Sequence, residues 1–437
     1  MVDYFSGVAL SGGFWIVLTG ILATASCGLL GSFLVLRKMS LLGDALSHAV
    51  LPGIAIAFLL SGSRGVLTMF IGAAIFGLFT TLLIEWLHKR WRVQEDASIG
   101  IVFTALFALG VVLISLFAGE VDLDQECVLY GEIAYTPWDT LLWNGSELGP
   151  RPVWILGGVL LVNLLLVVLF YKELLISSFD PAMAVAVGVN ATLIHYLLMG
   201  AVSLTTVAAF ESVGAILVVA MMIVPGAAAY LWSDRLPVIL VLSVLFGMAS
   251  SIGGYWLAGL WDSSIAGAMV VMIGLIFALS LLLAPGRGLL ARLWQRLGLS
   301  VQMAQDHMLL NLVRRGESAQ GESASAPGLV AVAGVWVGLA RLGLRRLGHR
   351  KLVAHIDGGV ELTGAGRQEA FRLLRNHRLW ETYMSELGLP EDHVHDPADA
   401  VEHFIDGELQ QQLGEAVAED RVDPQGKEIP PAPPGGG

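Results

Sequence analysis

Apolar segments long enough to cross a lipid bilayer dominate most of this chain. A membrane-spanning helix needs about 20 apolar residues. Runs of this kind lie at 14–36, 41–60, 65–87, 97–118, 152–171, 191–208, 212–232, 237–258 and 264–284. Only 14% of the residues are charged and the mean hydropathy is +0.71, whereas soluble proteins carry about 25% charge. We therefore predict an all-α polytopic membrane protein with about nine transmembrane helices, eight or nine because only Glu211 separates the sixth run from the seventh.

The composition also excludes several classes of protein. A net charge of -12 argues against a chain that binds nucleic acid throughout, because phosphate contacts need a local excess of Lys and Arg. The two cysteines, Cys27 and Cys127, are too few for a disulfide framework or a thiolate zinc cage. No basic region precedes the first apolar run, so we interpret this run as a retained span and not as a cleaved signal peptide.

Lys and Arg alternate between the two sides of the predicted bundle. One side carries Arg37, Lys38, Lys89, Arg90, Arg92, Lys172, Arg235, Arg287 and Arg292. The other side carries Arg64, Arg151 and the acidic stretch 120–126. Since cytoplasmic loops are enriched in positive charge, we predict a multi-pass protein of the bacterial plasma (inner) membrane with an external N-terminus and a cytoplasmic C-terminus.

The character of the chain changes after about residue 286. Residues 287–328 are a basic amphipathic connector followed by a small, polar and flexible loop. Helix-like periodicity with ordinary charge density then resumes from 333 to 412. The Pro- and Gly-rich segment 421–437 is predicted to be disordered. The expected organisation is thus a transmembrane domain, 1–286, followed by a small, mainly helical cytoplasmic domain.

An acidic residue and a histidine lie at the head of the second predicted span. Asp44 and His48 are four residues apart, so a helix projects both from one face. Ionisable groups at membrane depth usually face a bundle interior or a water-filled path. One carboxylate and one imidazole suit manganese, iron or zinc better than calcium or magnesium. The alternative is structural: Asp44 favours a helix N-terminus, and His48 bonds a backbone carbonyl.

The surrounding sequence, SLLGDALSHAVLPG at 40–53, closely resembles the metal-ion permeases of ABC importers, which move manganese, zinc and iron. The resemblance covers roughly residues 12–285 and includes 94–103, 177–189 and 212–231. It implies that Asp44 and His48 are the metal-handling pair of the translocation path. It also implies an external metal-binding protein and a second permease subunit, identical or related, as partners.

The chain lacks the phosphate-binding pattern G-x-x-x-x-G-K-[ST]. We therefore predict that it is not an enzyme, and that a separate cytoplasmic subunit hydrolyses ATP. The resemblance implies that a short helix within 177–189 docks on this ATPase, the alternative being an ordinary loop. The residues expected to form it are Phe179, Asp180, Pro181, Ala184 and Gly188. Glu211 either lines the path or sits at the external end of a helical hairpin.

The cytoplasmic domain contains two further sets of metal-ligand residues. His377 and Glu381 are four residues apart, with His395 before the next predicted helix. Asp399, Glu402 and His403 share one face of that helix. Clustered oxygen and nitrogen donors suit a transition metal, although solvated amphipathic faces would give the same pattern.

The segments HRLWE at 377–381 and HDPADAVEH at 395–403 resemble the metal-sensing and dimerisation domain of the diphtheria-toxin-repressor family of iron and manganese regulators. The resemblance implies a metal-sensor-like domain over 367–420. It assigns one metal site to His377, Glu381 and His395, and part of another to Asp399, Glu402 and His403. It also implies a winged-helix-like segment over 329–366, with 355–362 as the wing.

This second resemblance is incomplete. Asp306 corresponds to a possible ligand, but Leu309 stands where manganese sensors have a carboxylate. The segment before the supposed recognition helix lacks a regular helix-turn-helix pattern and is interpreted as degenerate. Three arginines follow it, and they contact either nucleic-acid phosphate or anionic lipid: Arg341, Arg345 and Arg346. A regulator tethered to a membrane would search a chromosome poorly, so we favour metal sensing over DNA binding.

The sequence thus predicts the permease subunit of an ATP-driven importer of manganese, zinc or iron, with a metal-sensing tail and no organic cofactor. Asp and His donors do not decide between these metals. Two alternatives stay open: a membrane-anchored, metal-responsive transcription regulator, and a secondary carrier that works without ATP.

Overall fold

The computed structural model describes residues 12–62, 66–117, 133–143, 146–318, 323–357, 359–390, 393–417 and 422–431. The chain divides into two compact units, Met1–Ala291 and Arg292–Gly437, and each is described by itself. Arg64, Cys127 and the acidic stretch 120–126 of the sequence analysis lie outside the described residues.

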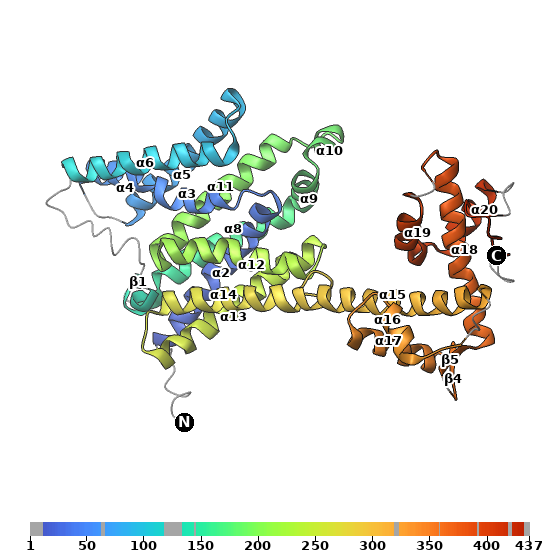
Figure 1. Ribbon diagram of the computed structural model, residues 1–437. Coiled ribbons are helices and arrows are strands. Elements are labelled where there is room, and N and C mark those ends of the chain that lie inside the picture. The colour runs from blue at the N-terminus through green and yellow to red at the C-terminus, as the bar shows by residue number, and fades with distance from the viewer. Residues whose placement is uncertain are drawn as a thin grey trace. The chain divides into compact units, whose positions relative to one another are not determined.

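The first unit is a bundle of helices (Figure 1). Its helices are α2 (Gly12–Leu36), α3 (Leu41–Ala49), α4 (Leu51–Ser61), α5 (Val66–Trp91), α6 (Glu95–Phe117), α8 (Arg151–Leu169), α9 (Tyr171–Phe179), α10 (Pro181–Ala186), α11 (Ala191–Val213), α12 (Ala215–Trp232), α13 (Leu236–Trp261) and α14 (Ile265–Leu283). A 3-10 helix, Ile133–Trp138, and a hairpin of β1 (Thr140–Trp143) and β2 (Ser146–Pro150) connect α6 to α8.

Eight helical stretches in the described part of the chain are long and apolar enough to cross a membrane, with α3 and α4 counted as one. The predicted seventh run forms α12, whose described apolar stretch, Leu217–Trp232, is shorter. These helices confirm the expected all-α polytopic fold. Only Gly214, at a φ of 81°, separates α11 from α12. Glycine adopts this left-handed conformation without steric cost, which explains why hydropathy barely separated the two helices.

Helix α2 lies at the centre of the first unit, where Leu30, Phe33 and Leu34 are fully buried. A Cβ atom on Gly31 would lie 1.7 Å from the Met222 carbonyl oxygen, so α2 and α12 are in backbone contact. Small residues at such contacts and hydrogen bonds between helices hold membrane bundles together. One such bond runs from Ser243 Oγ to the Gly28 carbonyl, at 2.9 Å. The core is therefore built on close backbone packing.

The second unit has the helices and strands of a winged helix followed by a helical domain (Figure 1). Its elements are α15 (Leu289–Glu317, from Arg292 on), β3 (Ser323–Ala324), α16 (Ala326–Val332), α17 (Val337–His349), β4 (Val353–Ile356), β5 (Gly359–Leu362), α18 (Gly364–Glu386), α19 (His395–Val401), the 3-10 helix η3 (Glu402–Phe404) and α20 (Gly407–Ala416). The antiparallel sheet has the order β3-β5-β4. Residues of α15, α16, α17, β5 and α18 share one core, which includes Met308, Leu329, Leu347, Val360 and Leu373.

The helix-turn-helix is more regular than the sequence indicated. Helices α16 and α17 meet at a bend of 120°, and β4 and β5 form the hairpin expected as the wing. Ser325 caps α16, accepting a hydrogen bond from the Gly328 N–H at 3.3 Å. The buried positions hold several small residues, such as Ala333 and Ala340. Such residues weaken the periodic hydrophobic signal by which helices are recognised.

The predicted disorder of 421–437 is corrected for part of that segment. Residues 422–431 form a turn bridged by Val422 and Glu428. Two arginines of α18 hold this turn, because Arg375 donates to the Pro430 carbonyl and Arg378 donates to the Glu428 carbonyl, each at 2.5 Å. The composition is poor in apolar residues, so it could not reveal anchoring by backbone carbonyls. Residues 432–437 lie outside the described residues.

Candidate functional site

Asp44 and His48 lie one turn apart on α3, as the sequence predicted. The distance from His48 Nε2 to Asp44 Oδ1 is 3.7 Å, and the two side chains are 29% and 47% exposed, respectively. The His48 ring packs edge-on against Phe107 of α6, at 5.7 Å between ring centroids. The pair therefore has one imidazole and one carboxylate on the same accessible helix face, backed by an aromatic wall.

The span that carries this pair has a local interruption directly after it. Helix α3 ends at Ala49 and α4 begins at Leu51, with Val50 between them. Pro52 stands in the first turn of α4, where its lack of a backbone N–H is tolerated. Val50 keeps a right-handed helical conformation, at a φ of -77° and a ψ of -15°, so α3 and α4 follow one another as a single span, Leu41–Ser61. The interruption is thus a local one beside the proline, which cannot donate the backbone hydrogen bond of a regular helix.

The predicted docking segment forms a short capped helix. Asp180 Oδ1 accepts a hydrogen bond from the Met183 N–H at 2.9 Å, and Pro181 opens α10. Ala184 is buried, and Gly188 reverses the chain at a φ of 84°. Large apolar side chains around α10 are exposed: Phe179, Met183, Val185 and Val187. The helix therefore presents an exposed apolar surface. The side chain of Glu211 lies outside the part of the chain that the structure describes.

A network of ionisable groups that the sequence analysis missed lies beside α10. The guanidinium of Arg37 donates to the hydroxyls of Ser177 and Ser178, at 2.9 and 3.1 Å. Its Nη1 lies 3.4 Å from His195 Nδ1. His195 Nε2 in turn lies 3.6 Å from Glu85 Oε2. The sequence signal for this network was Glu85, a carboxylate near the end of the third predicted span.

The three residues of the first predicted cytoplasmic metal set come together completely. His377 Nε2 lies 3.1 Å from Glu381 Oε1 and 3.1 Å from His395 Nδ1. His395 Nδ1 lies 2.8 Å from Glu381 Oε1. Helix α18 supplies His377 and Glu381, and the first residue of α19 supplies His395. These three side chains are close enough to hold one metal ion.

The second predicted set is divided. Asp399 and Glu402 face His377, whose Nδ1 lies 3.3 Å from Asp399 Oδ1 and 2.7 Å from Glu402 Oε2. His403 faces α15 instead, with its Nδ1 3.0 Å from Asp306 Oδ2 and its Nε2 3.2 Å from His307 Nε2. The other oxygen of Glu402 lies 3.7 Å from His403 Nε2. His307 was missed although it adjoins Asp306, because neighbouring positions of a helix point in different directions.

Contacts between the histidines and carboxylates of this cluster shift their pKa values. Burial alone lowers the pKa of His377, but its hydrogen bonds with Glu381 and Glu402 raise the pKa to about 9. Burial raises the pKa of Glu381, but the hydrogen bond and charge of His377 lower it to about 2. Burial lowers the pKa of His403, but its hydrogen bond with Asp306 raises this pKa above the usual value. In the absence of a metal ion, protonated histidines therefore balance the charge of the buried carboxylates.

The hydrogen bonding of two carboxylate oxygens indicates whether a metal ion would fit this cluster. Glu381 Oε2 and Glu402 Oε1 are buried and have no hydrogen-bond partner. A buried acceptor without a partner costs about 1–3 kcal/mol, and more when it is charged. Imidazole nitrogens and carboxylate oxygens together suit divalent transition metals. The unpartnered atoms and the donor set both fit such an ion.

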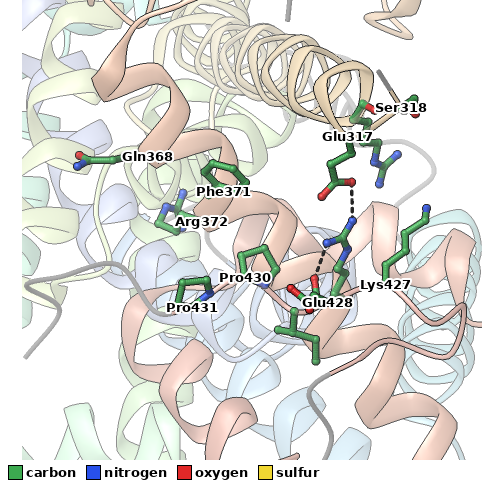
Figure 2. Close-up of a pocket in the computed structure, with 12 residues that line it drawn as sticks. Glu317, Ser318, Gln368, Phe371, Arg372, Lys427, Glu428, Pro430 and Pro431 are labelled. Atoms are coloured by element: carbon green, nitrogen blue, oxygen red, sulfur yellow. Dashed lines mark hydrogen bonds and ion pairs between the residues drawn. The ribbon is translucent and has the colours of Figure 1, made fainter. Parts of the chain in front are cut away.

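A separate cavity of about 950 Å³ lies elsewhere in the second unit (Figure 2). Its lining includes Glu317, Phe371 and Lys427, and Arg378, which also lines it, donates to Glu317 Oε2 at 2.7 Å. None of the six predicted cytoplasmic ligands lines this cavity.

Comparison with known proteins divides the chain at a similar place. Residues 13–284 match the ABC 3 transport family. Residues 363–431 match the metal binding and dimerisation domain of the iron dependent repressor.

Individual relatives resemble the first unit. The manganese transport system membrane protein MntD of Bacillus subtilis is 50% identical over 290 residues, which are 66% of this chain and 98% of that protein. The zinc transport system membrane protein TroD of Treponema pallidum is 47% identical over 277 residues, 63% of this chain and 75% of that protein. Among solved structures, PsaBC from Streptococcus pneumoniae in complex with Fab is 34% identical with a TM-score of 0.55, covering 65% of this chain and 97% of that one.

Proposed function

The chain belongs to the ABC 3 transport family and is a permease subunit of a metal importer, and we propose that ATP hydrolysis in a separate cytoplasmic subunit drives it. The cargo we propose is a divalent transition metal: manganese, zinc or iron. The observation that carries this proposal is the pairing of Asp44 and His48 on one face of α3, at the head of a membrane span. Both are ligands for such ions.

We propose that a second permease subunit completes the path. Asp44 and His48 are only partly covered within one chain, and two side chains are too few to replace the hydration shell of a divalent ion. A second copy, or a sister permease, would add donors and exclude lipid and water. An external binding protein would deliver the metal to this path.

Helix α10 is the proposed docking element for the ATPase. Its exposed apolar residues, among them Met183 and Val185, suit a hydrophobic groove. Arg37 lies between this element and the path, since it bonds Ser177 and Ser178 and begins the link from α2 to α3. Movement of α10 would thereby reach the helix that carries Asp44 and His48.

We further propose that the second unit senses cytoplasmic metal and regulates transport. Its match to a metal binding and dimerisation domain and its unpartnered buried carboxylate oxygens support this role. The residues proposed to hold metal are His377, Glu381, His395, Asp399, Glu402 and His403. Metal bound there would report a full cytoplasmic pool to the permease to which the domain is joined.

The decisive experiment measures metal uptake into proteoliposomes that contain the assembled importer. We expect Asp44→Asn/His48→Gln to abolish uptake of manganese, zinc and iron while ATPase docking persists. The matched control is Asp262→Asn, because Asp262 is exposed and its left-handed conformation, at a φ of 49°, is one that asparagine tolerates. Normal uptake by a correctly inserted double variant would refute the assignment of the path.

A second candidate function rests on α17. The exposed residues Arg341, Arg345 and Arg346 lie on the second helix of the helix-turn-helix, a position that can contact DNA. The alternative is therefore a membrane-anchored, metal-responsive transcription regulator. DNA binding by the purified chain that depends on metal and on Arg345 would favour it over regulation of transport. We favour transport regulation, because anchoring restricts a search of the chromosome.

A further inference from the structure

His307 is a donor that neither the predicted ligand sets nor the proposed function uses. It lies on α15 directly after Asp306, and its Nε2 faces His403 Nε2 at 3.2 Å. His403 is almost fully buried, with a side chain that is 2% exposed. Leu309, on the same helix, leaves the site without the carboxylate that the sequence analysis had sought there. The structure thus has an additional imidazole where a carboxylate was expected.

Hydrogen bonding fixes which ring nitrogens can bind a cation. His307 Nδ1 lies 3.3 Å from the Ala333 carbonyl, which can only accept a hydrogen bond. His403 Nδ1 lies 3.0 Å from Asp306 Oδ2, and an ionised carboxylate also only accepts. Each neutral ring therefore carries its proton on Nδ1. Both Nε2 atoms then have free lone pairs, directed at each other across 3.2 Å.

Two opposed lone pairs at this distance repel each other unless a positive species lies between them. Either a proton or a metal ion can fill this place. A metal ion would use both lone pairs. The backbone carbonyl and the carboxylate behind the rings are the outer partners that orient metal-bound histidines in known sites.

A third donor completes the set. Glu402 Oε1 lies 3.7 Å from His403 Nε2 and is buried without a hydrogen-bond partner. The nearest donor atoms of His307, Glu402 and His403 all lie within 4.8 Å of one another. Helix α15 supplies one of these donors and η3 the other two, so the site fastens the first helix of the winged helix to the helical domain within the same unit.

We propose that His307, His403 and Glu402 form a three-donor site for a divalent transition metal that favours zinc over manganese. The inference rests on the proposed metal-sensing role and deepens it. Two imidazoles and one carboxylate with an open fourth position are a donor set that zinc uses, whereas manganese favours sites richer in oxygen. Asp306 is a positioning residue in this site, because it holds the ring of His403 and is not itself a ligand.

The test uses the full-length chain in nanodiscs, with Asp44→Asn/His48→Gln in the background to remove the transport pair. Zinc and manganese are titrated separately in competition with a chromophoric chelator. We expect His307→Gln, which removes one of the three proposed ligands, to weaken zinc binding by at least about 10- to 100-fold, the loss that follows when only an outer partner of a ligand is removed, and manganese binding far less. The matched control, His349→Gln, alters an exposed histidine of α17 and should change neither affinity.

A variant that gains a spectroscopic signal distinguishes loss of a ligand from loss of folding. In His307→Cys loaded with cobalt(II), thiolate ligation should produce a charge-transfer absorption band that His349→Cys does not show. An unchanged zinc affinity in His307→Gln, or no such band in His307→Cys, overturns this inference. If Glu402→Gln also leaves binding unchanged, the metal-sensing proposal fails as well. Loss of binding in Glu402→Gln alone leaves that proposal standing and removes only the role of His307.

Discussion

His377 Nδ1 lies 2.7 Å from Glu402 Oε2, and this contact joins α18 to η3 inside the second unit. Both side chains are almost completely buried, at 4% and 0% exposure. Glu402 directs its other oxygen to His403, so one carboxylate belongs to two clusters. A change in protonation or metal occupancy of one cluster therefore alters the contacts of Glu402 with the other cluster.

The first prediction concerns pH and the stability of the metal-free second unit. The pKa of His377 is raised from its ordinary value of 6.5 to about 9 in the folded protein. Its contribution to stability is thus fully present below 6.5 and is lost as pH rises through 9. Glu381, with a folded pKa of about 2 against 4.5, contributes above 4.5 and loses its contribution as pH falls toward 2. With chelator present, the unit should therefore be most stable between these limits, near pH 5–6.

Thermal unfolding of the whole chain in nanodiscs, measured from pH 4 to about 10, checks this expectation. His377→Gln should remove the fall in melting temperature of the second unit on the alkaline side. His355→Gln, which alters an exposed histidine of β4, should retain it. A His377→Gln chain with the same alkaline fall as the His355→Gln control would contradict the assigned pKa.

The second prediction concerns communication between α10 and the metal path. Arg37→Gln removes charged hydrogen bonds to Ser177 and Ser178, each of which is worth about 1.5–3 kcal/mol. We expect ATP hydrolysis to continue while the metal transported per ATP falls about tenfold or more. The ratio of the two rates in proteoliposomes measures this coupling. Arg235→Gln, an exposed arginine before α13, is the control, and an equal ratio in both variants would exclude the role of Arg37.

Local spacing explains what could be predicted from the sequence. Hydropathy predicts the spans. Spacing by four positions on a helix predicts the pair of Asp44 and His48 and the pair of His377 and Glu381. The contact of His307 with His403 joins residues 96 positions apart, and no periodicity within one helix encodes it. The Glu85 and His195 pair, between α5 and α11, was missed for the same reason. The separation of His403 from Asp399 depends on where α19 gives way to η3 at Glu402.

The third prediction concerns the packing of α2 against α12. A Cβ on Gly31 would lie 1.7 Å from the Met222 carbonyl oxygen, and two helix backbones cannot yield as a flexible side chain can. Gly31→Ala should lower the free energy of unfolding by at least about 1–3 kcal/mol, the usual cost of overpacking. Gly259→Ala in α13 meets no atom within 4 Å and should be neutral or slightly stabilising. Thermal unfolding in detergent compares them, and equal melting temperatures would contradict the close contact.

The fourth prediction concerns the anchoring of residues 422–431. Arg378 is buried at 4% exposure, bonds Glu317 and the Glu428 carbonyl, and lies 3.4 Å from Asp423 Oδ2. Removal of one partner from a buried ion pair costs about 3–5 kcal/mol, because the remaining charge is left uncompensated. In Arg378→Gln we expect the segment to detach and become a target for limited proteolysis, detected by mass spectrometry of the C-terminal fragment.

Detachment would also reach the metal cluster, since Gln425 of this segment donates to Glu381 Oε1 at 3.3 Å. Zinc and manganese titrations of Arg378→Gln should therefore show altered affinity at the His377, Glu381 and His395 set. Arg350→Gln, an exposed arginine after α17, should resist the protease as the unaltered chain does. Equal cleavage of both variants would mean that Arg378 does not hold the segment. Cleavage without any change in metal affinity would mean that the segment is held for stability alone.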